Sequence, residues 1–256
     1  LGTPISVSAT YIFAFLLFGA FLVKTGVGEY FNDLAISVAG KLIGGPAKVA
    51  IFSSALQGTI SGSSVANVVT SGAYTIPLMK RLGYKKDFAG AVEASSSTGG
   101  QLMPPIMGAA AFLMVEFIGR GITYWDIAKA AAIPAILYFA GIWIMTHFEA
   151  KRLGLRGLTD EEMPDRKEII KKIYLLIPIA LIIVIMMFGV PVIHSALYGI
   201  IACIIVGVLN KDVKFGPREI VDALVDGART ALSVVAATAC AGIIVGVVVK
   251  TGLGLS

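Results

Sequence analysis

Six stretches without a charged residue constrain this chain more than any other feature of its sequence. At about 1.5 Å per residue, a helix needs roughly 20 apolar residues to cross the hydrocarbon layer of a membrane, and each stretch is close to that length. Hydrophobic residues make up 57% of the chain and charged residues only 14%, whereas roughly a quarter of a soluble domain is charged. The sequence therefore predicts an all-α polytopic membrane protein. The stretches are Ile5–Val23, Ala94–Val115, Ala130–Phe148, Ile173–Val190, Val192–Leu209 and Ala231–Val249.

The charge pattern and the cysteines exclude some functions. The net charge is +5, and the basic residues form short clusters between the apolar stretches. They do not follow one face as a nucleic-acid-binding surface would, so we expect no nucleic-acid partner. Cys203 and Cys240 each lie in an apolar stretch with no second cysteine or histidine at ligand spacing, so we expect packing residues. The opening "LGTPISVSATY" has no initiator methionine or basic leader, which suggests that it is internal to a longer protein.

A seventh uncharged stretch, Val49–Met79, has small polar residues at its centre, Gly58–Ser64. The limbs on either side are about fourteen residues, or about 21 Å, and are too short for each to cross the membrane. The stretch is either one long span or a re-entrant hairpin that enters the membrane and returns. An ordinary buried helix with a Gly/Ser kink is the simpler alternative.

Basic residues favour the hairpin, which we place at about residues 46–79. Lys41 and Lys48 precede it, and "KRLGYKK" (80–86) follows it. A single crossing would put positive clusters on both sides of the membrane, against the positive-inside tendency. If the stretch is a hairpin, counting the later spans places the basic loops at 149–172 and 211–218 on the cytoplasmic side as well, as the positive-inside tendency requires. Non-helical backbone at membrane depth must be buried in protein or line a polar cavity, so the hairpin tip is a candidate site.

A second interruption lies in "EASSSTGGQLMPPIMGAAAF" (93–112). Gly99, Gly100, Pro104 and Pro105 cannot sustain a continuous helix, so we expect a discontinuous helix at about residues 88–116. Secondary transporters form ion and substrate sites at the membrane midplane from broken helices of this kind. Two interruptions close together in the chain therefore predict a binding site.

The two ends of the chain share a short motif. "FLVKTGVG" (21–28) and "VVVKTGLG" (247–254) have Val-Lys-Thr-Gly-x-Gly in common, although chance similarity between glycine-rich helix ends is an alternative. With five crossings between the copies, Lys24 and Lys250 would lie on opposite sides of the membrane, as in an inverted repeat. We therefore expect residues 1–256 to be a fragment of a single transmembrane transport domain. Residues 1–210 would form the first repeat, and residues 211–256 an amphipathic arm helix (216–232) and the first span of the second repeat.

The segments "GTISGSSVANVVTSGAYTIPLMKRLGY", "AGAVEASSSTGGQLMPPIMGAAAFLM" and "GIIVGVVVKTGLG" resemble the large membrane subunit of tripartite ATP-independent periplasmic (TRAP) transporters. "GGPAKVA" and "VEASSSTGG" most resemble the fused permeases that work with TAXI-type binding proteins. The resemblance implies an inverted-repeat, elevator-type secondary transporter in a bacterial or archaeal cytoplasmic membrane. It also implies a periplasmic solute-binding protein, a small membrane subunit or its fused equivalent, and uptake of an organic anion with a cation, usually sodium.

The resemblance further implies a sodium site between the hairpin tip and the helix break. The residues it assigns to that site are Ser61, Gly62, Ser63, Ser64 and Asn67 on the tip, and Thr98, Gly99, Gly100 and Met103 at the break. It implies no other cofactor. Gln101 departs from the family pattern, which often has proline there, and its amide could reach the substrate or cap freed backbone. We expect substrate contacts from Ser64, Asn67, Ser97 and Gln101.

Glu93 stands at the start of the broken span, and an intramembrane carboxylate is a functional candidate. It could couple transport to protons instead of sodium, or it could be an interfacial residue near Lys85 and Lys86. Two other function classes stay open. One is an intramembrane serine hydrolase with Ser61 or Ser63 as nucleophile and His147 or His194 as base, although both histidines lie near span ends. The other is a channel.

Overall fold

The computed structural model describes residues 2–119 and 121–251, and every regular element in that part of the chain is helical. Contacts divide the chain into two compact units, residues 1–25, 109–127 and 178–256 in the first, and residues 26–108 and 128–177 in the second. The α-helices are α1 (Gly2–Val7), α2 (Phe13–Lys24), α3 (Val27–Ala39), α4 (Gly45–Ser61), α5 (Ser64–Arg81), α6 (Lys86–Gly99), α7 (Ala109–Ile118), α8 (Tyr124–Arg152), α9 (Arg166–Lys171), α10 (Ile177–Met187), α11 (Val192–Leu209) and α12 (Pro217–Thr251). A π-helix, η1 (Ser8–Ile12), and three 3-10 helices, η2 (Gly100–Leu102), η3 (Asp160–Glu162) and η4 (Ile173–Leu176), complete the list.

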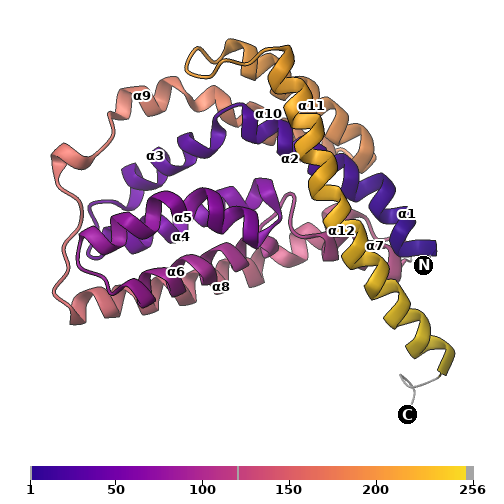
Figure 1. The fold of residues 1–256 in the computed structure, drawn as a ribbon, viewed down its shortest axis with the longest axis horizontal. Coiled ribbons are helices and arrows are strands. Elements are labelled where there is room, and N and C mark those ends of the chain that lie inside the picture. The colour runs from indigo at the N-terminus through magenta and orange to yellow at the C-terminus, as the bar shows by residue number, and fades with distance from the viewer. Residues whose placement is uncertain (1, 120, 252–256) are drawn as a thin grey trace. The chain divides into compact units, whose positions relative to one another are not determined.

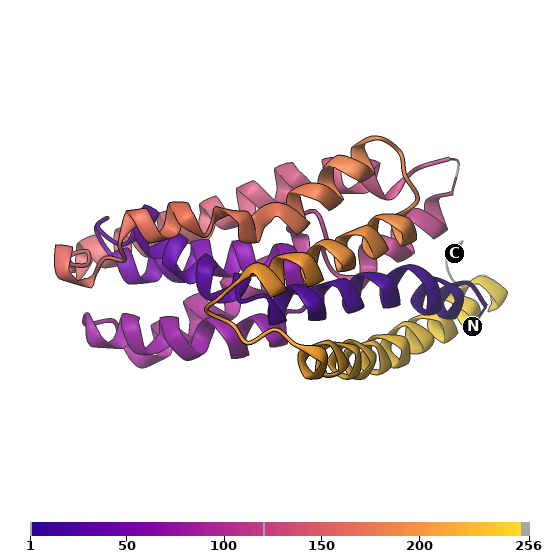
Figure 2. The same cartoon turned by 90° about the horizontal axis from the view of Figure 1, so that it is seen from above.

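The first unit is built on α2, which packs against both α11 and α12. The α12 helix runs antiparallel to α1 and α2 (Figure 2). Two polar contacts fix this register: the hydroxyls of Ser8 and Thr238 lie 2.6 Å apart, and Lys24 Nζ lies 2.8 Å from Asp226 Oδ2. At Gly199 a Cβ atom would lie 2.5 Å from Ile182, so the absent side chain lets α10 and α11 approach closely.

The second unit stacks α4 and α5 between α3 on one side and α6 with α8 on the other (Figure 1). Small buried residues at the helix contacts, among them Ala47, Ala50, Ala89 and Ala150, let the backbones approach closely. Bulkier side chains such as Met79 fill the remaining space. Close packing of five helices therefore holds the hairpin and the break in one unit.

Four of the six predicted spans correspond to helices with the length and apolarity to cross a membrane, and a bent pair of helices makes a fifth candidate. Four are unbroken, Ile5–Lys24, Tyr124–Arg152, Val192–Leu209 and Pro217–Val248. A fifth candidate joins the charged arm Asp160–Lys171 to the apolar arm Ile173–Met187 at a bend of 69°. The structure thus confirms the fold class predicted from the sequence, an all-α, multi-pass membrane protein.

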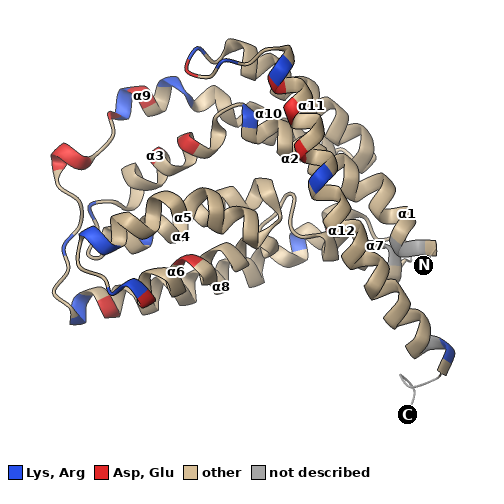
Figure 3. Ribbon diagram, in the orientation of Figure 1, with Lys and Arg blue, Asp and Glu red and all other residues tan. Residues whose placement is uncertain are grey.

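Several charged residues of the second unit lie at the end of the hairpin remote from its tip. Figure 3 shows them where α5 ends, where α6 begins and where α8 ends. Lys41, Arg81, Lys85 and Lys86 are exposed there. This is the distribution expected of a hairpin whose two ends lie on the same side of a membrane.

The C-terminal part of the chain differs from the expected arrangement of an arm helix and a separate span. Residues 217–251 form one continuous 35-residue helix, α12. After Pro217 the segment has no proline, and the few glycines in it are tolerated in a long apolar helix, so nothing divides the amphipathic part from the apolar part. Residues 252–254 of the second Val-Lys-Thr-Gly-x-Gly copy lie outside the described residues.

Candidate functional site

The hairpin tip is the two-residue link between α4 and α5. Gly62 takes a left-handed conformation (φ 56°), and Ser63 is extended. Ser63 Oγ then accepts a hydrogen bond from Ala66 N at 3.3 Å and caps the start of α5. A Cβ atom on Gly62 would lie 2.1 Å from the carbonyl oxygen of Met107. Only glycine suits both this backbone conformation and this close approach.

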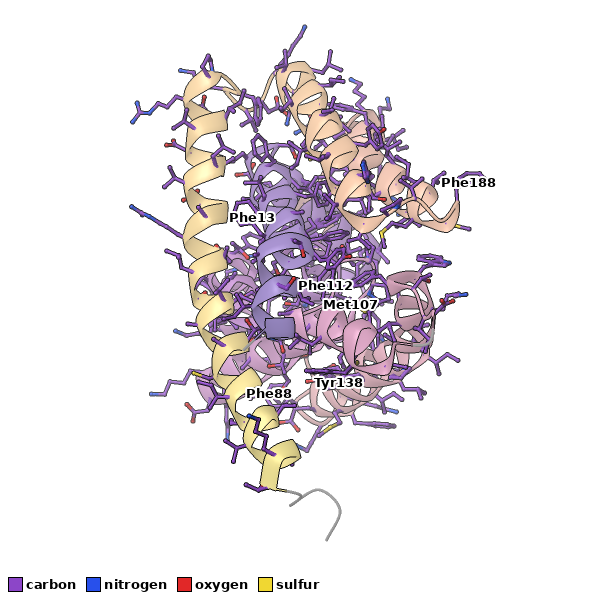
Figure 4. All side chains as sticks on the ribbon, turned by 90° about the vertical axis from the view of Figure 1, so that its right-hand side faces the viewer. Phe13, Phe88, Met107, Phe112, Tyr138 and Phe188 are labelled. Atoms are coloured by element: carbon purple, nitrogen blue, oxygen red, sulfur yellow. The ribbon has the colours of Figure 1, made fainter. Side chains whose placement is uncertain are left out.

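The discontinuous helix breaks where the sequence predicts. The α6 helix ends at Gly99, and η2 adds one 3-10 turn. The chain then runs without regular helix from Met103 to Gly108 before α7 begins. Within the break, Met107 has a positive φ of 54°, and Gly108 N donates to the carbonyl of Gln101 at 2.8 Å. Figure 4 shows the side chains of Met107 and of Tyr138, a residue of α8 that packs at the end of α6.

The hairpin and the break meet through backbone. A Cβ on Gly58 would lie 2.2 Å from Gly100 Cα, and one on Gly100 would lie 3.0 Å from Asn67 Nδ2. Gln101 Nε2 also reaches Ser64 Oγ at 3.4 Å. The interruption at the tip and the interruption at the break therefore form one locus, in which Asn67 is fully buried and Ser64 is partly buried.

Other residues of the predicted sodium site have local partners. Ser61 Oγ donates to the carbonyl of Ser63 at 3.3 Å, and the exposed Thr98 donates to the carbonyl of Ala94 at 2.8 Å. The carbonyl of Met103 accepts from Met107 N at 3.2 Å. Gly99 faces α8, where a Cβ would lie 2.4 Å from the ring of Tyr138. Gly100, not Gly99, is the glycine of the break that touches the hairpin.

Glu93 is fully buried, with 0% of its surface exposed. Its carboxylate accepts hydrogen bonds from hydroxyls on three helices: Ser54 on α4, Ser71 and Thr75 on α5, and Ser97 on α6. The interpretation of Glu93 as an interfacial residue near Lys85 and Lys86 is therefore wrong, because the side chain points into the packing of the hairpin against α6. Ser97, expected to contact substrate, donates to Glu93 Oε1 at 3.0 Å.

A second polar cluster, which the sequence analysis missed, joins α3 to the hairpin. Asn32 Oδ1 accepts from Ser53 Oγ and, at 3.1 Å, from Gln57 Nε2. Gln57 Oε1 in turn accepts from Thr70 Oγ1 at 2.8 Å. Ser53 and Gln57 are one helical turn apart on α4, and that spacing was the available signal. The cluster joins both limbs of the hairpin to α3.

A buried lysine lies near the start of the hairpin. Lys48 is 4% exposed, its Nζ lies 3.0 Å from His147 Nδ1, and it sits 5.2 Å from the centre of the Trp143 ring. His147 is thus paired with an amine, and it has no described contact with Ser61 or Ser63. His194, the other base considered for a hydrolase, is exposed on α11. The geometry gives no support to a serine–histidine pair.

The first unit contains a cavity of about 480 Å³. Rings and methionines dominate its lining, including Tyr11, Phe112, Trp125 and Met186. Its one carboxylate, Asp126, accepts from Thr123 Oγ1 at 2.6 Å and from Thr123 N at 3.0 Å. This cavity is separate from the polar locus at the hairpin tip, which belongs wholly to the second unit.

Comparison with known proteins agrees with the geometry. A sialic acid TRAP transporter large permease protein of Vibrio cholerae is 28% identical over 161 residues, 63% of this chain and 37% of that protein. A C4-dicarboxylate TRAP transporter large permease protein of Pseudomonas aeruginosa is 37% identical over 91 residues, 36% of this chain and 21% of the relative. An isethionate TRAP transporter permease protein of Oleidesulfovibrio alaskensis is 27% identical over 143 residues, 56% of this chain and 22% of the relative.

The matched regions cover 20–37% of the length of these and other curated relatives. The family model of the tripartite ATP-independent periplasmic transporter DctM component matches residues 1–256. The family and the three relatives named above are transport permeases, not enzymes. The chain therefore belongs to the DctM component family of tripartite ATP-independent periplasmic transporters.

Proposed function

We propose that this chain is part of the permease of a binding-protein-dependent secondary transporter in the bacterial inner membrane, which imports an organic anion together with sodium. The observation that carries the proposal is the backbone contact between Gly58 on the hairpin and Gly100 at the helix break. It holds the hairpin against the broken helix, and each of these contains non-helical backbone, at Gly62 and Ser63 in the tip and from Met103 to Gly108 in the break. Such segments persist in a membrane when they line a polar site.

Sodium would bind among uncharged oxygens at this locus. Ser61, Ser63 and Ser64 offer hydroxyls on the tip, and Gly100 and Met103 offer carbonyls at the break. Hard cations take oxygen ligands of this kind. An ion held by both segments would stabilise the tip against the break, so that sodium binding completes the site to which the solute then binds.

The solute would bind beside the start of α5. The first turn of a helix has free N–H groups and a partial positive charge, which favour an anion. The partly buried Ser64 and the exposed Gln101 stand at that end and offer further donors. Sialic acid, C4-dicarboxylates and isethionate, after which the three relatives are named, are all organic anions. A carboxylate is the group we expect this site to hold.

Family membership supports two further parts of the proposal. A periplasmic solute-binding protein would deliver the anion, and a small membrane subunit, or its equivalent fused to the large one, would complete the permease. The segments "GGPAKVA" and "VEASSSTGG" favour the TAXI type of binding protein and the fused arrangement. Transport would follow an elevator movement, in which the second unit, containing the tip and the break, carries the bound solute.

The test is uptake into proteoliposomes that contain the purified permease, with its binding protein outside, under a sodium gradient or a proton gradient imposed separately. We expect saturable uptake that needs both sodium and the binding protein. Ser63→Leu should abolish sodium-dependent uptake, because it places a bulky apolar group at the tip. Ser233→Leu, on an exposed face of α12, is the matched control and should transport normally.

Unchanged sodium dependence in Ser63→Leu would contradict the assignment of the tip. Uptake that does not saturate and needs no binding protein would indicate a channel.

Proton-coupled symport is the second candidate, and the complete burial of Glu93 is the observation that favours it. A carboxyl group inside a membrane protein can carry a proton across as the site changes sides. If a proton gradient drives uptake without sodium, and Glu93→Gln abolishes that uptake, then the proton, and not sodium, is the coupling ion.

A further inference from the structure

We propose that Glu93 and the four hydroxyls around it, Ser54, Ser71, Thr75 and Ser97, form a proton-binding site separate from the sodium site at the tip. The structure satisfies both protonation states of the carboxyl group with the same arrangement of heavy atoms. Its role in coupling rests on the proposed transport function, whereas proton binding itself can be measured without transport.

The ionised state is satisfied by four donors. Ser54 and Ser97 lie 3.2 Å and 3.0 Å from Oε1, Ser71 also contacts Oε1, and Thr75 lies 2.5 Å from Oε2. A carboxylate has about four lone-pair positions and accepts only. With all four hydroxyl hydrogens turned toward it, the buried charge accepts three hydrogen bonds at Oε1 and one at Oε2, as a buried charge requires.

The protonated state is satisfied by rotating two hydroxyls. Thr75 Oγ1 also lies 3.0 Å from the carbonyl of Ser71, and Ser71 Oγ lies 2.8 Å from the carbonyl of Asn67. When Glu93 carries a proton on Oε2, it donates to Thr75, and Thr75 donates to the carbonyl of Ser71. Ser71 turns to Asn67, while Ser54 and Ser97 continue to donate to Oε1. No buried polar group loses its partner in either state.

The surroundings of Glu93 are uncharged. None of the ion pairs between described residues includes it. The titratable side chains on the four elements around it have partners elsewhere or lie toward the charged end of the unit. On α4, Lys48 bonds His147 of α8, and Tyr138 of α8 donates to the carbonyl of Ser95. The others are Tyr74, Lys80 and Arg81 on α5, Lys86 and Asp87 on α6, and Tyr124, Asp126, Lys129, Glu149, Lys151 and Arg152 toward the two ends of α8. Within the part of the chain that the structure describes, no ion pair fixes a cation beside the carboxylate, so its charge can change without breaking one.

The proton site is connected to the tip by two hydrogen bonds. Ser71, which changes acceptor with the state of Glu93, can donate to the carbonyl of Asn67. Asn67 Nδ2 donates to the carbonyl of Ser54 at 2.9 Å and lies beside Gly100 at the helix break. Proton binding at Glu93 therefore changes the hydrogen bonds of the residue that packs under the tip. A proton and sodium would then influence one another through Asn67.

Infrared difference spectroscopy of the purified permease in nanodiscs tests proton binding directly. A protonated carboxyl group has a C=O band separate from that of a carboxylate. We expect a carboxyl band that decreases as pH is raised, shifts in heavy water, and is lost in Glu93→Gln. Glu161→Gln, which changes an exposed loop carboxylate, should leave that band intact. A Glu93 band that never changes over the pH range in which the protein stays folded would overturn the proposal, as would the absence of any band lost in Glu93→Gln.

The infrared band of Glu93 in the Ser97→Ala variant is a second test. This band would not change if Ser97 only packed between the helices. Ser97 donates to Glu93 Oε1, which is the carbonyl oxygen of the protonated carboxyl group in this arrangement. Loss of this donor should move the C=O band of Glu93 to higher frequency than in the wild type, because fewer hydrogen bonds reach Oε1. An unchanged frequency would contradict the proposed network.

The two proposals fail separately. A titrating Glu93 band in a permease without sodium-dependent uptake would leave the proton site standing and refute sodium symport. Sodium-dependent uptake in a permease whose Glu93 band does not change with pH would support sodium symport and refute the proton site.

Discussion

At the scale of single residues, two glycines decide whether the hairpin can touch the helix break. Gly58 and Gly100 meet Cα to backbone, and a side chain on either would overlap main-chain atoms instead of a movable side chain. Not every glycine of the same unit has such a role. At Gly90 a Cβ would meet nothing within 4 Å. Packing therefore requires glycine at positions 58 and 100, whereas Gly90 makes no close contact and only lowers the stability of the α6 helix.

Substitution by alanine should separate these two cases. Gly58→Ala should lower the free energy of unfolding by about 1–3 kcal/mol, because overpacking against backbone forces the helices apart. Gly90→Ala should raise it by up to about 1 kcal/mol through better helix propensity. Denaturant titration of both variants in the same detergent gives the comparison. Equal effects of the two substitutions would show that Gly58 and Gly100 are not in contact.

At the scale of elements, the loop between α8 and α9 is fastened to the ends of two other helices. Asp160 pairs with Lys41, and Arg81 Nη2 lies 2.8 Å from Glu162 Oε1. Glu162 also accepts from Thr159 N at 3.0 Å in a capping box. The hydrogen bond and charge of Lys41 lower the pKa of Asp160, and the backbone hydrogen bond from Thr159 lowers that of Glu162. These carboxyls lie in the charged loop outside the apolar spans.

The lowered pKa values give a direction for the effect of pH on this loop. A carboxyl group whose pKa is lower in the folded chain than in the unfolded chain stabilises the folded state at pH values above its unfolded-state pKa. This contribution is lost as the pH falls through the pKa of the folded state. We expect amide hydrogen exchange of residues 158–165 to accelerate on acidification, after correction for the intrinsic rate. Asp160→Asn with Glu162→Gln should exchange fast at neutral pH and show little further change. A pH response that survives the double substitution would exclude these carboxyls as its cause.

The elements differ in how far the sequence could predict them. Gly62 at the tip, and Gly99 to Pro105 at the break, are local signals, and the structure interrupts its helices at both. The partners of Glu93 could not be read in the same way. Ser54 lies 39 positions away and Ser71 lies 22, and they meet Glu93 only because of the register in which α4, α5 and α6 pack. The pairing of Lys48 with His147, 99 positions apart, depends on packing in the same way.

At the scale of the whole molecule, the distribution of charge orients the chain in the membrane. The hairpin interpretation puts the connection before α4 and the connection between α5 and α6 on the cytoplasmic side. A single crossing by residues 49–79 would put them on opposite sides. The two-helix geometry of α4 and α5, with its turn at Gly62 and Ser63, fits the hairpin, and labelling in a membrane can test it.

Single cysteines at Lys41 and Lys85 make that test, because both side chains are exposed. The background should carry Cys203→Ala and Cys240→Ala, since Cys240 is exposed and would react. We expect a membrane-impermeant thiol reagent to label Lys41→Cys and Lys85→Cys in inverted vesicles, and neither in right-side-out vesicles. Both positions must also be labelled equally after the membrane is permeabilised. Labelling of one position from each side would make α4 and α5 a single crossing, and the basic clusters would then flank a span in violation of the positive-inside tendency.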